Sequence, residues 1–219
     1  MIKNILFDFG GVVVPLNAEE GYRRFEALGI KDASLRLGKY GQTGIFLECE
    51  KGEIDVPTFQ RKVTELAHQL SPEIQPLDKL ISFDQCKWAW CGYVTEVRQN
   101  RLENLLSLKE KYNVILLSNT NPFIMDWADS ELFSEDGHPL SYYFHRVFYS
   151  YKLKDYKPSP TIFQKVLEKA DINASETLFL DDSAANIESA KALGIHGLLV
   201  PKNEDWMDML TDYLRAYES

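Results

Sequence analysis

Short apolar runs alternate with longer stretches of helical spacing along most of the chain. The apolar runs are rich in Val, Ile, Leu and Phe, which is typical of strands buried on both faces of a parallel sheet. They lie at 2–7, 114–117, 146–149, 177–180 and 196–200. Amphipathic helices are predicted at 97–111, 162–170 and 184–193 and after Asn203. This alternation predicts an α/β fold with a doubly wound parallel sheet.

One segment departs from the alternation of strand and helix. Between 17 and 92, apolar residues recur at helical spacing, and Asp55 and Pro57 suit the start of a helix. We find no convincing strand pattern there. We therefore expect an α/β core domain made of 1–16 and 93–219, and a helical cap domain at 17–92.

The charge balance limits the partners. With 33 acidic and 24 basic residues, the formal net charge is −9, so neither nucleic acid nor an anionic membrane is an expected partner. Three cysteines cannot close a full disulfide framework and fit a reducing compartment. The first apolar run is too short for a signal peptide, and no stretch reaches the length of a membrane span. We expect a cytoplasmic protein; no pattern indicates an oligomeric state.

Polar residues follow three of the predicted strands, at the edge where open parallel sheets bind ligands. A lysine also precedes the predicted helix at 162–170. These residues are Asp8, Ser118, Asn119, Lys157, Asp181 and Asp182. A carboxylate nucleophile, hydrogen-bond donors, a cation and further carboxylates for Mg²⁺ are the components of phosphoryl transfer.

Each of these residues also has a simpler interpretation. Aspartate and serine are common in turns, which suits Asp8 and Ser118. Asp182 suits the cap of the helix at 184–193, and lysines are usually on the surface. The position of Lys157 and a proline just before a helix favours an anion site instead.

Four motifs occur in a fixed order along the chain. They are FDFGGV at 7–12, LSNTN at 117–121, KP at 157–158 and FLDDSAANI at 179–187. Together they resemble the motifs of the haloacid dehalogenase superfamily of hydrolases, over nearly the whole chain. The resemblance implies a Rossmann-like core with a helical cap. The most similar subgroup is the bacterial sugar-phosphate phosphatases that resemble α-glucose-1-phosphate phosphatase.

This resemblance implies a magnesium site. Asp8 would attack phosphorus and also bind the metal, and the Gly10 carbonyl would be a further ligand. Asp182 would be the main second carboxylate, with Asp181 and Asn186 close by, directly or through water.

The resemblance also implies a phosphoryl site for a small phosphorylated substrate. Ser118 and Asn119 would hold the transferring phosphoryl oxygens. Lys157 would neutralise charge on the nucleophile and on the phosphoryl group.

Gly10 departs from the superfamily pattern, in which a second aspartate protonates the leaving group and activates water. General acid–base help is worth about 10²–10⁴-fold in rate. Without it, the substrate has a good leaving group, another residue or a water takes over, or the protein binds phosphate compounds with little turnover. Dehalogenases of the superfamily also lack this aspartate, but they have no use for a metal. The pair of aspartates after 180 therefore favours a magnesium-dependent phosphatase acting on a small phosphomonoester such as a sugar phosphate.

Two groups of residues in the insert have no clear role. The aromatic group comprises Trp88, Trp90 and Tyr93. At this spacing, packing between cap and core is commoner than stacking on a sugar. The acidic group of Glu48, Glu50 and Glu53 is expected to be a solvated helix end. We expect the cap to close over the site and exclude water, but it carries no readable specificity code.

Overall fold

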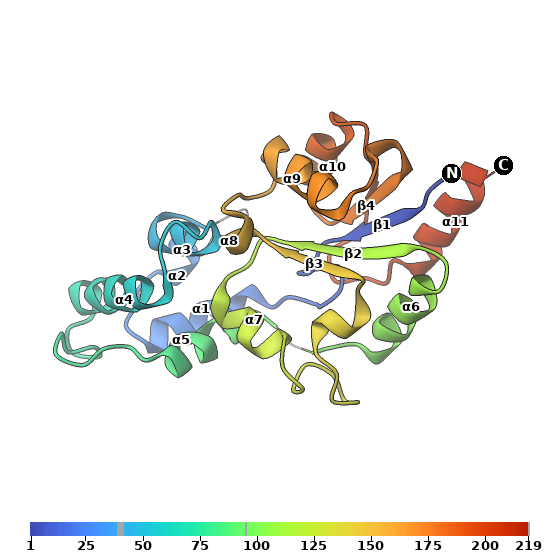
Figure 1. Cartoon of the computed structure of the whole chain (residues 1–219). Helices are drawn as coiled ribbons and strands as arrows, with labels where there is room; N and C mark the ends of the chain where they lie inside the picture. Colours follow the sequence, from blue (N-terminus) through green and yellow to red (C-terminus); the bar gives the residue numbers. More distant parts are fainter. Residues whose placement is uncertain (39–41, 95, 219) are drawn as a thin grey trace.

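A five-stranded parallel sheet forms the centre of the computed structural model, which describes residues 1–38, 42–94 and 96–218 (Figure 1). The strand order is β3-β2-β1-β4-β5. The strands are β1 (Asn4–Phe7), β2 (Asn113–Ser118), β3 (Arg146–Tyr149), β4 (Thr177–Asp181) and β5 (His196–Leu199). All neighbouring strands are parallel, and strands and helices alternate, so the predicted doubly wound α/β fold is confirmed.

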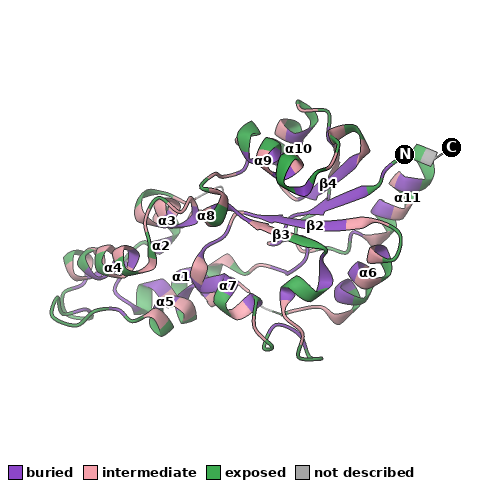
Figure 2. Ribbon diagram, viewed as in Figure 1, coloured by how far each residue is buried: buried purple, intermediate pink, exposed green. Residues whose placement is uncertain are grey.

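Helices cover both faces of the sheet. In Figure 1, α9 and α10 lie above it, while α6, α7 and α11 lie below it. The helices outside the insert are α6 (Gln99–Lys109), α7 (Pro122–Ala128), α8 (Ser150–Leu153), α9 (Pro160–Ala170), α10 (Ala184–Lys191) and α11 (Met207–Glu218). Figure 2 shows β1, β2 and β4 as largely buried and the helices as buried on their inner sides.

Side chains of β1 alternate between two apolar cores, as the pleat of a strand requires. Ile5 and Phe7 pack in the core that includes α6 and α11. Leu6 packs with Ile162 and Phe163 of α9 in the other core. Because both faces are covered, β1 is buried throughout and apolar from Ile5 to Phe7, and the chain becomes polar again just after the strand, at Asp8.

The segment 18–93, which we call the helical insert, contains only helices and turns among its described residues. They are α1 (Ala18–Ala27), α2 (Ala33–Arg36), α3 (Gly44–Glu50), α4 (Val56–Leu70), α5 (Phe83–Trp90) and a 3₁₀ turn (Cys91–Tyr93). As predicted, Asp55 caps α4, accepting a hydrogen bond from the Thr58 amide at 2.9 Å. The apolar core of the helical insert includes Phe25, Phe46 and Trp90, whose rings are in edge-to-face contact.

The loop between β1 and the helical insert is anchored from below the sheet. Arg101 of α6 is fully buried and donates a hydrogen bond to the Val12 carbonyl at 2.6 Å. The indole of Trp206 donates to the same carbonyl at 3.1 Å. Asn203 pairs with the backbone of Leu16 in both directions. These hydrogen bonds hold the loop that follows β1, which carries Gly10, in a fixed position beside the strand ends.

Candidate active site

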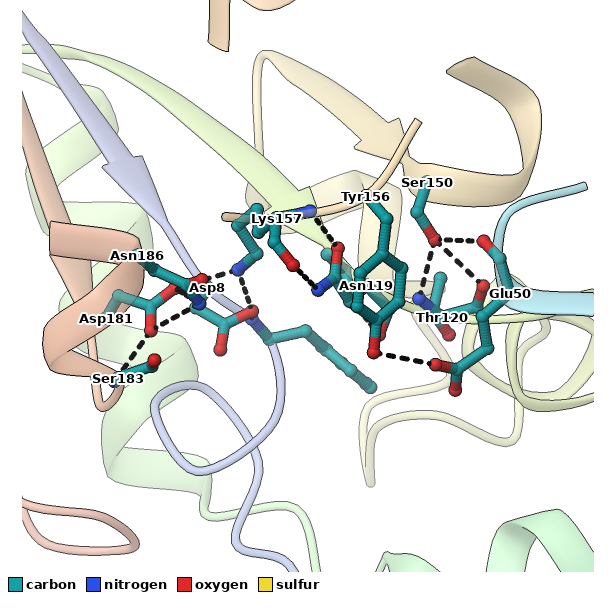
Figure 3. A network of polar contacts seen from close by, with 12 residues as sticks. Asp8, Glu50, Asn119, Thr120, Ser150, Tyr156, Lys157, Asp181, Ser183 and Asn186 are labelled. Carbon is teal, nitrogen blue, oxygen red and sulfur yellow. Dashed lines mark hydrogen bonds and ion pairs between the residues drawn. The ribbon is translucent and has the colours of Figure 1, made fainter. Parts of the chain in front are cut away.

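The carboxyl ends of β1 and β4 bring the predicted polar residues together. The Asp8 amide bonds to the Leu180 carbonyl at 2.9 Å, which keeps the two strand ends in register. Lys157, from the loop between α8 and α9, then reaches across both ends. Its Nζ lies 2.7 Å from Asp8 Oδ1 and 2.8 Å from Asp181 Oδ2 (Figure 3). A strand-end carboxylate, a cation and a second carboxylate therefore meet as the sequence predicted.

Lys157 is an internal charge and not the surface lysine of the simpler interpretation. Its side chain is 1% exposed. Burial alone would lower its pKa, but the carboxylates of Asp181 and Asp8 outweigh burial, so the pKa of Lys157 is raised. The two carboxylates therefore favour the charged ammonium form of Lys157 over the neutral amine.

Asp181 is the more enclosed of the two aspartates after β4. It is fully buried, and both of its oxygens lie 3.0 Å from Asn186 Nδ2. The Ser183 amide donates to Asp181 Oδ1 at 2.8 Å, and Lys157 donates to Oδ2. Asp182 is partly exposed. Asp181 thus orients Lys157 and Asn186, whereas Asp182 faces a more open space.

Three carboxylates gather at this edge of the sheet. Oxygens of Asp8, Asp181 and Asp182 all lie within 4.8 Å of one another. Burial raises the pKa of Asp8 to about 7, and Asp181 and Asp182 add to the rise although Lys157 opposes it. One lysine is thus insufficient to balance three carboxylates, and a hard, oxygen-seeking divalent cation fits this donor set.

The glycines after Asp8 let the backbone approach the carboxylates. Gly11 has a φ of +85°, and a Cβ there would lie 2.5 Å from Asp182 Oδ2. At Gly10, where the superfamily pattern has an aspartate, a Cβ would lie 2.8 Å from Leu16 Cδ1. The space where that side chain would point is therefore occupied by apolar Leu16, and Gly10 itself supplies no acid or base.

Ser118 and Asn119 follow β2 at the same edge. The Asn119 side chain pairs with the main chain of Lys157 in both directions, each bond 2.9 Å long. Ser118 is buried, and its hydroxyl lies 3.4 Å from the Asn119 carbonyl. Asn119 therefore holds the lysine loop in place. Contact of either residue with phosphoryl oxygens stays a prediction.

Glu50, at the end of α3, corrects one expectation. Its neighbours Glu48 and Glu53 are at least partly exposed, but Glu50 is only 5% exposed, so a wholly solvated helix end is wrong. Glu50 Oε2 accepts a hydrogen bond from the Tyr156 hydroxyl at 3.1 Å. The burial of Glu50 could have been inferred from the sequence, because Phe46 and Glu50 are four residues apart and therefore lie on the same side of α3.

Two cavities meet at the strand ends. One, of about 570 Å³, is lined by Lys157, Asp182 and Asn186, and we call it the carboxylate cavity. The other, of about 200 Å³, lies between the core and the helical insert and includes Glu50 and Trp90; we call it the insert cavity. The two share Asn119, Tyr156 and Lys202 as lining residues.

The three aromatic residues of the insert differ in burial. Trp90 and Tyr93 are buried and line the insert cavity, and Trp90 also packs against Phe25. Trp88 is 41% exposed and lies under the Arg24 guanidinium. The predicted packing role therefore holds for Trp90 and Tyr93.

The fold and the site together define an α/β protein with a carboxylate-rich site at the carboxyl ends of parallel strands. The chain belongs to the haloacid dehalogenase-like hydrolases, whose family model matches residues 2–194. It is 39% identical over 216 residues to the D-ribitol-5-phosphate phosphatase of Bacteroides thetaiotaomicron, covering 99% of this chain and 100% of that protein.

Solved structures agree with this assignment. A HAD-like family hydrolase from Porphyromonas gingivalis superposes with a TM-score of 0.86 at 35% identity, covering 98% of each chain. A HAD family enzyme from Bacteroides thetaiotaomicron, in complex with magnesium and inorganic phosphate, has a TM-score of 0.83 at 34% identity, covering 95% of this chain and 99% of that one. The predicted superfamily and the assignment as a phosphatase-type enzyme are confirmed. Among the described residues, no helix combines the length and apolar character needed to cross a bilayer.

Proposed function

We propose that this enzyme is a magnesium-dependent phosphatase that hydrolyses a small sugar or polyol phosphate through an aspartyl-phosphate on Asp8. The observation that carries the proposal is the placement of Asp8 at the end of β1, 2.7 Å from Lys157 and within 4.8 Å of two further carboxylates. The relative that hydrolyses D-ribitol 5-phosphate supports the substrate class. The neighbour solved with magnesium and phosphate supports the metal.

The hydrogen bonds of Asp8 distinguish its two oxygens. Oδ1 accepts from Lys157 Nζ and from the Phe9 amide, both at 2.7 Å. Oδ2 has no hydrogen-bond partner in the part of the chain that the structure describes. In the proposed first step an Asp8 oxygen forms a bond to phosphorus while the ester oxygen leaves with its electron pair and takes a proton from water. Water then attacks phosphorus and releases phosphate and the free carboxylate.

Lys157 and the metal balance charge during these steps. Lys157 stabilises the Asp8 carboxylate beside the incoming phosphate. Mg²⁺, when bound, supplies charge that screens the repulsion between the two anions. The residues that would hold it are Asp8, Asp182 and the Gly10 carbonyl, with Asp181 and Asn186 close by. Asp181 holds Lys157, which in turn pairs with Asp8.

Two alternatives have specific grounds. Gly10 favours a weakly catalytic phosphate-binding protein, because this position has no side chain to protonate the leaving group. A 2-haloacid dehalogenase also needs no such proton. It has no use for a metal, however, so the three clustered carboxylates argue against it.

The test is phosphate release from a panel of phosphomonoesters, with and without Mg²⁺, together with halide release from 2-haloacids. The matched variants are Asp8→Asn and, as a control at an exposed aspartate of the insert, Asp78→Asn. We expect multiple turnovers that require Mg²⁺, a loss of at least about 10³-fold in Asp8→Asn, and no loss in Asp78→Asn. Tight phosphate-ester binding without turnover, or halide release that resists EDTA, would replace this proposal with one of the alternatives.

A further inference from the structure

The insert cavity contains polar atoms that the protein leaves unpaired. Thr120 Oγ1, Trp90 Nε1 and Gln42 Oε1 are buried without a hydrogen-bond partner among the described residues, and all three residues line this cavity. Buried polar atoms in folded proteins almost always have a partner. These three therefore indicate a polar ligand, because their partners are not supplied by the described part of the chain.

Glu50 adds a carboxylate to the same cavity. A carboxylate accepts up to about four hydrogen bonds, and Glu50 receives one from the Tyr156 hydroxyl. Burial raises the pKa of Glu50 to about 7, and the opposing effects of Tyr156 and Asn121 do not offset it, so further donors would stabilise the charged form. Hydroxyl donors from a ligand would supply them.

Ser150 holds Glu50 and Thr120 in place. Its hydroxyl lies 2.6 Å from the Glu50 carbonyl and 3.1 Å from the Thr120 carbonyl, and it accepts from the Thr120 amide at 2.9 Å. A side chain at Gly52 would run into the carbonyl of Tyr151, so the end of α3 lies directly against α8. The main chain that carries both polar side chains is thus held in place before any ligand arrives.

The position of the insert cavity relative to Asp8 suits the organic part of a phosphate ester. Figure 3 shows Glu50 and Thr120 on the far side of Asn119 and Tyr156 from Asp8. Asn119 and Tyr156 line both cavities, so the insert cavity is the adjoining space for the ester group of a phosphate at Asp8. At about 200 Å³ the cavity is smaller than the roughly 300–1,000 Å³ typical of drug-sized ligands, so a small group fits it.

The chemistry of the lining distinguishes between small groups. Glu50 and Gln42 present acceptors, Trp90 presents a donor, and Thr120 presents both. Hydroxyl groups donate and accept, so a chain that carries several of them matches this set, whereas an alkyl chain would leave the atoms unpaired. Apolar neighbours such as Leu16 and Ile124 suit the C–H faces of the same chain.

We infer that Glu50 and Thr120, with Trp90, form a hydroxyl-binding subsite that selects polyhydroxylated phosphate esters over alkyl esters of the same length. This inference rests on the proposed phosphatase function. Glu50 and Thr120 act on the choice of substrate, and the chemical step takes place at Asp8.

The experiment compares D-ribitol 5-phosphate with n-pentyl phosphate, which has the same five-carbon chain and no hydroxyls. The variants Glu50→Gln and Thr120→Val keep the shape of each side chain, and Glu53→Gln is the control at an exposed glutamate just beyond the same helix. We expect the wild-type enzyme to prefer the ribitol ester in kcat/KM. In either cavity variant the ratio of the two kcat/KM values should fall by about tenfold or more, mainly through the KM of the ribitol ester. The control should keep the wild-type ratio.

Three results would overturn the inference: a wild-type enzyme with no preference, variants with an unchanged ratio, or variants that lose activity equally on both esters. Equal loss on both esters would mean that the residue has a general structural or chemical role. Thermal unfolding of each variant distinguishes these two roles, since only a structural role lowers the melting temperature. If the wild-type enzyme hydrolyses neither ester, the proposed function fails on its own. Calorimetric titration with the same two esters then decides, since the inference requires a binding preference that Glu50→Gln removes.

Discussion

The carboxylate cavity and the insert cavity present opposite states of hydrogen bonding. At the first, Lys157 Nζ donates hydrogen bonds to Asp8 and Asp181 at 2.7 and 2.8 Å. Asn186 and the Ser183 amide also donate hydrogen bonds to Asp181. In the second, Thr120 and Trp90 have buried polar atoms without a partner among the described residues, and the Glu50 carboxylate accepts a hydrogen bond from Tyr156. Both lie at the same edge of the sheet and share lining residues.

This difference indicates a division of labour. Charges that stabilise a transition state work best when they are fixed in advance, which is the state of the Lys157 network. Groups that recognise a substrate stay unpaired until it binds, and they then reject molecules that cannot pair with them. We therefore expect mutations in the carboxylate cavity to lower the turnover of every substrate. Mutations in the insert cavity should lower the turnover of polyhydroxylated esters only.

The largest effect should follow from removing the central cation. Lys157→Met leaves Asp8 and Asp181 buried without their shared partner. We expect kcat to fall by at least about 10³-fold on all substrates and the free energy of unfolding to fall by about 3 kcal/mol. The measurements are steady-state kinetics and urea unfolding, with Lys169→Met at an exposed position of α9 as the control. A variant that loses activity on polyol esters alone would break the comparison.

Metal removal should have an effect of similar size on activity and a smaller one on stability. EDTA should abolish turnover of every ester. Because Mg²⁺ relieves the repulsion between Asp8, Asp181 and Asp182, adding it should raise the melting temperature of the wild-type protein by several degrees. In Asp182→Asn that rise should shrink. Scanning calorimetry at matched ionic strength is the check, and an equal rise in Asp182→Asn would place the metal elsewhere.

The smallest effect concerns the stability of the unliganded protein. The pKa of Glu50 is raised from an ordinary value of 4.5 to about 7, chiefly by burial, so the folded state holds a proton that the unfolded chain releases. Stability is therefore lost as pH rises from about 4.5 to 7 and is constant above that range. Glu50→Gln does not titrate and should therefore be more stable than the wild-type protein above pH 7.

Urea unfolding at pH 5 and pH 8 tests this sign directly. Tyr156, the hydrogen-bond donor to Glu50, stays neutral throughout because burial and then Glu50 itself raise its pKa. The gain of Glu50→Gln should be larger at pH 8 than at pH 5. A variant that is less stable at both values would mean that the Glu50 carboxylate already has enough partners, and the contrast between the two cavities would disappear.

The sequence predicted the carboxylate cavity well, for a physical reason. Asp8 and Asp181 lie at the ends of strands whose apolar pattern is local, and Lys157 lies just before a helix of the same kind, so their convergence followed from the rules of parallel sheets. The lack of a side chain at Gly10 was also visible directly in the sequence. The structure added that Leu16 lies where a Cβ at Gly10 would point.

The insert cavity could not be predicted in the same way. The burial of Glu50 depends on α3 packing against α8, two helices about 100 positions apart in the chain, through the Ser150 hydroxyl. Local charge composition favoured a solvated helix end, and tertiary packing overruled it. Helix limits also shifted: α6 begins at Gln99, two residues after the expected start.

The most direct test of the central claim is a rapid-quench experiment with a ³²P-labelled phosphate ester and excess wild-type enzyme in Mg²⁺. Attack by Asp8 predicts a transient protein-bound label that hydroxylamine releases, as expected for an acyl phosphate, and that maps to the peptide containing Asp8. Asp8→Asn should show no label. Full turnover without any labelled protein, or a label on a different residue, would contradict the account.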